Sequence, residues 1–189
     1  MMRNALYLAA VLGFGFDSLA SAGSWPIPEV VLCCSEMREN PHEILGKESG
    51  QIVVVRNMGN VVSLAGQKPD SIEIASVEYA VLHGATKVIV LGHSNCSVIK
   101  SVIDDEEAVG HLPAIFQVIH KSVTEATRVV GDDKERLLAE AVRRNVLNSA
   151  SRLRNDRFVL SKLDSSRCTI VAGCYDSKAK VLEILDEVE

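Results

Sequence analysis

Four short apolar runs rich in valine, isoleucine and leucine predict buried β-strands. Each run is bounded by Gly, Asn, Ser or Pro, and none alternates regularly between apolar and polar residues. Strands that are apolar on both faces are usually parallel and covered by helices, so the pattern favours a parallel sheet. The runs span residues 30–34, 52–55, 87–91 and 169–172.

Between these runs, apolar residues recur three and four positions apart, which predicts amphipathic helices. The expected helices span residues 72–82, 98–103, 112–130 and 133–153. Asp70 and Ser71 supply a helix cap before the first of them, and His83 with Gly84 supplies a stop. A further strand over residues 180–185 follows the turn-like segment 176–178 and is expected at the sheet edge.

Strand and helix therefore alternate, and no internal repeat or Pro/Gly-rich linker divides the chain after its first residues. We predict an α/β fold over residues 29–189, a single domain with a central, mostly parallel β-sheet flanked by helices. Ligands of such sheets bind at the carboxyl ends of the strands.

Residues 1–28 form an apolar N-terminal segment with two interpretations. Arg3 precedes the apolar run 5–16, and Ala20 to Ala22 offer a small-residue cleavage site, as in a secretory signal peptide. The alternative is a retained helical arm that packs on the domain or on a partner subunit. A retained arm predicts a cytoplasmic protein, whereas removal of residues 1–22 predicts a periplasmic or secreted one. The run is too short for a membrane span.

Composition narrows the classes of function. The 189 residues are 47% hydrophobic and 24% charged, the balance of a globular protein with a substantial core. A net charge of −5, with 4% aromatic residues and no long Lys/Arg run, argues against nucleic-acid binding. The five cysteines are odd in number and include an adjacent pair, which favours reduced thiols or thiolate ligands over a disulfide framework.

Two of the predicted strand ends carry metal-ligand residues. One strand ends in Cys33-Cys34, followed by Ser-Glu-Met-Arg, and another is followed by Gly-His-Ser-Asn-Cys at 92–96. His93 and Cys96 are three residues apart, and a helical turn there would place both on one face. With Cys34 as third ligand they would form a Cys2His zinc set with an open fourth position. Core cysteines beside a hydrogen-bonded histidine remain the alternative.

Four blocks of sequence resemble the β-class carbonic anhydrases in order and spacing, and the resemblance covers residues 29–186. The blocks are residues 34–38, 54–60, 76–81 and 90–96, with further matches at 144–146 and 171–176. The family motifs C-x-D-x-R and H-x-x-C imply that Cys34, His93 and Cys96 bind Zn²⁺. Cys33 falls one residue early, and strand alternation turns it to the other face, where it would be a core residue.

The resemblance also implies an activity and an assembly. The expected reaction is the reversible hydration of carbon dioxide to bicarbonate and a proton by metal-bound hydroxide, with Glu36 and Arg38 orienting the water. At least a homodimer is expected, because the family's clefts lie at subunit interfaces. Related enzymes hydrolyse carbonyl sulfide or carbon disulfide with the same metal set, so these substrates remain an alternative.

Three residues depart from the family pattern. Glu36 replaces the aspartate, Ser97 replaces a glycine, and Val31 replaces the tryptophan of a regulatory bicarbonate pocket. The additional methylene of Glu36 leaves three alternatives. The backbone retracts and preserves the contact with Arg38, the carboxylate takes the fourth zinc position and leaves little or no activity, or the side chain points to solvent.

Overall fold

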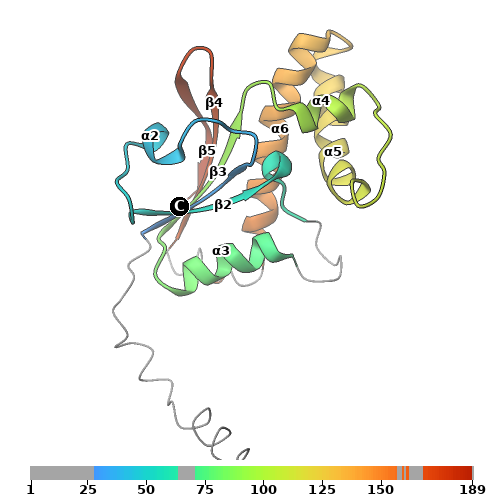
Figure 1. The fold of residues 1–189 in the computed structure, drawn as a ribbon. Coiled ribbons are helices and arrows are strands. Elements are labelled where there is room, and N and C mark those ends of the chain that lie inside the picture. The colour runs from blue at the N-terminus through green and yellow to red at the C-terminus, as the bar shows by residue number, and fades with distance from the viewer. Residues whose placement is uncertain (1–27, 64–70, 157–158, 160, 162–167, 189) are drawn as a thin grey trace, which may run out of the picture.

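The computed structural model describes residues 28–63, 71–156, 159, 161 and 168–188. A five-stranded sheet in the order β2-β1-β3-β4-β5 forms its centre (Figure 1). The strands are β1 (Glu29–Cys34), β2 (Ile52–Asn57), β3 (Lys87–His93), β4 (Thr169–Asp176) and β5 (Val181–Val188). The first four are parallel and β5 is antiparallel to β4. The predicted α/β fold with a mostly parallel sheet is confirmed.

Helices connect the strands and cover the sheet. They are α2 (Pro41–Leu45), the short 3₁₀ helix η2 (Met58–Asn60), α3 (Ile72–Leu82), α4 (Ser97–Ile103), α5 (Pro113–Val130) and α6 (Lys134–Arg154). The four helices predicted from periodicity correspond to α3, α4, α5 and α6. Ser71 caps α3, because its hydroxyl accepts a hydrogen bond from the Ile74 amide at 3.2 Å. Asp70 and the expected N-terminal arm, except Pro28, lie outside the described residues.

The two faces of the sheet bury different sets of side chains. Leu32 lies in register with Val90 of β3, which in turn lies beside Ala172 of β4, and these residues pack with α3 and α6. The intervening residues, such as Cys33 and Leu91, belong to the opposite face, where Ile44 and Leu45 of α2 pack against them. Strand alternation thus separates the two adjacent cysteines.

A third apolar cluster joins α4, α5 and α6 beside the sheet (Figure 1). It contains Val98 and Ile99 of α4, Ile119 of α5 and Val142 of α6. Cys34 and Cys96 are part of this cluster, so helix packing fixes the positions of both thiols. Among the described residues, no helix is long and apolar enough to cross a membrane.

Candidate metal centre

Adjacent parallel strands bring two of the predicted ligands to the same edge of the sheet. Cys34 is the last residue of β1 and His93 the last of β3, and these strands pair in parallel. Asn95 turns the chain with a φ of 60°, a left-handed conformation that asparagine adopts more readily than most residues. Cys96 then directly precedes α4. The turn returns the second thiol toward the first.

Cys34, Glu36, His93 and Cys96 form a cluster whose ligand atoms all lie within 4.8 Å of one another. The two sulfur atoms are 4.0 Å apart, and both cysteines are free and buried. A tetrahedral ion with Zn–S bonds of about 2.3 Å would hold its sulfurs roughly 3.8 Å apart. The separation of the thiols therefore fits a shared metal better than a disulfide, whose S–S bond is about 2.05 Å.

The ring of His93 is oriented for metal binding. Its Nδ1 lies 3.0 Å from the Ser94 carbonyl oxygen, which can only accept, so Nδ1 carries the proton of the neutral ring. Nε2 is buried and has no hydrogen-bond partner among the described residues. A buried nitrogen without a partner is costly unless a metal or another group satisfies it. The donor set therefore fits a zinc ion.

The environment of Cys34 favours its thiolate. The pKa of Cys34 is lowered to about 4, first because the Cys96 thiol donates a hydrogen bond to it, against the effect of burial. The backbone amides of Glu36 and Gly59 also donate to its sulfur, at 3.4 and 3.2 Å. The pKa of Cys96 is raised because its proton is held by Cys34 and its site is buried. Without metal, the two sulfurs share one proton.

This arrangement predicts proton release when zinc binds. Burial lowers the pKa of His93, but the nearby Cys34 sulfur outweighs this effect, so the pKa is raised overall. Zinc needs both thiolates and a neutral imidazole. It must therefore displace the Cys96 proton and any second proton on the His93 ring. We expect the release of at least about one proton per zinc at pH 7, and an apparent affinity that rises at least about tenfold per pH unit near neutrality. Calorimetry in buffers of different ionisation enthalpy measures this release, and binding without it would contradict the prediction.

Two side chains brace the backbone around Cys34. Arg56 donates from Nη1 to the carbonyl oxygens of Cys34 and Met37, at 3.1 and 3.0 Å, and so fixes the turn that follows β1. Asn145 of α6 is fully buried and donates to the Gly59 carbonyl oxygen at 2.7 Å. The sequence alone does not predict this role of Asn145. Its signal was a polar residue within an apolar stripe of the predicted helix.

Of the two residues expected to orient a water, the structure brings only Glu36 to the cluster. Its carboxylate accepts hydrogen bonds from the Ser97 amide, at 2.8 Å, and from the Ser97 hydroxyl. Burial raises the pKa of Glu36, but these bonds outweigh it and lower the pKa overall. Arg38 is exposed and forms no ion pair with Glu36 within the described part of the chain. Ser97 is one of the departures from the family pattern, but the sequence alone does not predict its contact with Glu36.

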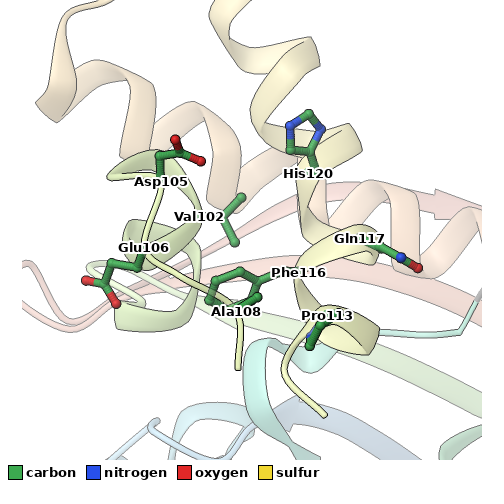
Figure 2. A pocket seen from close by; sticks show the side chains of 8 residues that line it. All are labelled: Val102, Asp105, Glu106, Ala108, Pro113, Phe116, Gln117 and His120. Carbon is green, nitrogen blue, oxygen red and sulfur yellow. The ribbon is translucent and has the colours of Figure 1, made fainter. Parts of the chain in front are cut away.

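A separate shallow pocket of about 230 Å³ lies between α4 and α5 (Figure 2). In Figure 2, Asp105 and Glu106 are directed outward, and Phe116 and His120 come from α5. No residue of the four-residue cluster lines this pocket, so it is not part of the metal centre.

The fold and the cluster together define an α/β protein with a candidate Cys2His metal centre at the carboxyl ends of parallel strands. The family model described as "Carbonic anhydrase" matches residues 29–181. The chain therefore belongs to the carbonic anhydrase family, and its structural neighbours place it in the β-class.

Curated relatives share close to a third of their aligned residues with this chain. It is 30% identical over 161 residues to a carbonic anhydrase of Pseudomonas aeruginosa, covering 82% of this chain and 71% of the relative. It is 31% identical over 151 residues to a carbonic anhydrase of a Synechocystis species, covering 76% of this chain. The match spans 54% of that second relative, so the chain corresponds to only about half of its length.

Solved structures agree in fold. The β-carbonic anhydrase CcaA superposes with a TM-score of 0.72 at 25% identity, covering 97% of this chain and 89% of CcaA. A tetrameric β-carbonic anhydrase of Sordaria macrospora superposes with a TM-score of 0.73 at 24% identity, covering 98% and 93%. The second likeness is one of fold alone.

Proposed function

We propose that the protein is a zinc enzyme that interconverts carbon dioxide and bicarbonate. The observation that carries the proposal is the buried Nε2 of His93, which has no hydrogen-bond partner in the described part of the chain, beside two thiols 4.0 Å apart. The family match and the relatives named carbonic anhydrase support it. Cys34, His93 and Cys96 would hold the zinc, which would supply a nucleophile for carbon dioxide by acidifying water near neutral pH.

The chain's own residues would hold the zinc ligands in position and limit the access of water to the site. The amides of Glu36 and Gly59 hold Cys34 in its ligand position, and Ser94 holds the tautomer of His93. The ligand side chains are at most 6% exposed, whereas Glu36 is only half-buried. Substrate and water would therefore approach past Glu36, whose carboxylate would accept a hydrogen bond from the incoming water.

A second candidate is a closed site in which Glu36 itself is the fourth ligand. It is favoured by the position of the carboxylate, one oxygen of which lies within 4.8 Å of the three other ligand atoms. Zinc would bind equally well, but carbon dioxide hydration would be slow at every pH. Carbonyl sulfide and carbon disulfide remain alternative substrates of an open site.

We also propose that the protein is a homo-oligomer, at least a dimer. The Sordaria macrospora neighbours are tetrameric. Large apolar side chains of α3 are open to solvent in the single chain, with Ile72 80% and Leu82 63% exposed. Apolar side chains gathered on one helix are typical of surfaces that contact another protein.

The test is the rate of carbon dioxide hydration against pH for the wild type and Glu36→Asp, with zinc assayed in both. We expect stoichiometric zinc and an activity that rises with pH through a transition near 7, where zinc-coordinated water typically ionises. A wild type no faster than buffer, with activity restored in Glu36→Asp, would show the closed site. Proteins without stoichiometric metal would contradict the proposal as a whole.

A further inference from the structure

The two departures from the family pattern nearest the metal centre contact each other. Glu36 and Ser97 are 61 residues apart in sequence, yet the amide and the hydroxyl of Ser97 both donate hydrogen bonds to the Glu36 carboxylate. One Glu36 oxygen accepts from the Ser97 amide and the other from its hydroxyl. The carboxylate is therefore held at two points by a single residue.

The position of Ser97 follows from rigid parts of the fold. It is the first residue of α4 and follows Cys96, whose side chain is 1% exposed and packed in the apolar cluster of α4, α5 and α6. Its neighbours Val98 and Ile99 are also buried, at 9% and 1% exposed. The buried residues on both sides therefore hold the Ser97 backbone in one place beside the carboxylate.

Arg38 does not hold the Glu36 carboxylate in the way that Ser97 does. It is exposed and, in the described segments, forms neither an ion pair with Glu36 nor a hydrogen bond to it. The backbone between them is fixed by Arg56, which binds the carbonyl oxygens of Cys34 and Met37. Within the described residues, Arg38 is therefore not paired with the carboxylate that it was expected to contact.

We propose that Ser97 is the positioning residue of Glu36: it holds the carboxylate beside the fourth position of the metal centre, in place of Arg38. This inference rests on the proposed zinc function and adds the residue that controls the Glu36 side chain. Without the hydroxyl, only the amide contact remains, and the carboxylate becomes free to turn toward the metal or toward solvent. Threonine at position 97 would preserve the hydroxyl.

The experiment compares Ser97→Ala, Ser97→Thr and Arg38→Ala in the zinc-loaded full chain, with zinc content measured for each. We expect kcat/KM for carbon dioxide to fall about 10-fold to 100-fold in Ser97→Ala, the usual effect of losing a partner outside the ligand set. Ser97→Thr should recover most of the activity, and Arg38→Ala should lose clearly less activity than Ser97→Ala. In a Glu36→Gln background, Ser97→Ala should cause little further loss, because the two residues act as a unit.

A second readout does not depend on activity. The visible absorption of the cobalt-substituted protein reports the ligands and geometry of the metal. We expect the spectrum to change in Ser97→Ala, to return toward that of the wild type in Ser97→Thr, and to change less in Arg38→Ala than in Ser97→Ala.

The two readouts separate this inference from the proposed function. A zinc-loaded wild type without carbon dioxide hydration would contradict the function, while the cobalt spectra would still show whether Ser97 positions Glu36. A Ser97→Ala protein identical to the wild type in both readouts would overturn the inference. So would an Arg38→Ala protein with the losses expected of Ser97→Ala, because the arginine would then hold the carboxylate.

Discussion

Cys34→Ala is expected to abolish stoichiometric zinc binding and to reduce carbon dioxide hydration to the rate of buffer. Cys34 is the thiolate of the pair, with a pKa lowered to about 4 by the hydrogen bond from Cys96 and by further donors. Loss of a partner outside the ligand set already costs up to about 100-fold in metal affinity, and loss of a ligand should cost more. Competition with a chromophoric chelator measures the affinity, and stopped-flow hydration measures the rate.

The adjacent residue supplies a matched control. Cys33 is also fully buried, but it belongs to the apolar cluster on the opposite face of the sheet, and burial raises its pKa to about 11. Cys33→Ala should therefore retain zinc and activity, with a loss of about 1 kcal/mol in the free energy of unfolding. Equal loss of zinc in the two variants would show that either change disrupts the edge of the sheet, and the assignment of Cys34 as a ligand would lose its support.

The sequence predicted the elements whose side chains pack in regular layers. The strands were recognised because their apolar runs are buried on both faces, and α3 was predicted from Ile72 to Leu82, as the structure has it. Alternation within β1 was sufficient to separate Cys33 from Cys34. Prediction of α2 failed, since five residues are too few to show helical periodicity. Its available signal was Asn40-Pro41, which the structure shows as an N-cap followed by proline at the helix start.

The candidate site was predictable only in part. The carboxyl ends of parallel strands lie at one edge of the sheet, so the meeting of Cys34 with His93 there could be expected. The contact between Glu36 and Ser97 could not, because it depends on how two turns are placed relative to each other. The exposure of Arg38 has the same origin: Arg56 fixes the turn after β1, and its hydrogen bonds go to backbone atoms that no sequence pattern marks.

The packing of α6 against β3 also supports the metal centre, so a substitution at their contact should affect both stability and zinc binding. A Cβ atom on Gly92 would lie 2.4 Å from Cγ2 of Val146, far inside van der Waals contact. Valine is stiff about its first side-chain torsion, so the clash cannot be relieved by a simple rotation. Gly92→Ala should therefore lower the free energy of unfolding by about 1 to 3 kcal/mol. Because His93 is the next residue, displacement of β3 should also weaken zinc binding.

The matched test is the double variant Gly92→Ala/Val146→Ala, which removes the methyl group that the new Cβ would meet. Val146→Ala alone leaves a cavity in a fully buried site and should be destabilising by itself. If the clash is the cause, the double variant should be less destabilised than the sum of the single variants by about 1 kcal/mol or more. Urea unfolding at one fixed protein concentration measures all four proteins. Additive losses would mean that α6 yields to the added methyl, and the close approach of this helix to β3 would then not be what holds His93 in place.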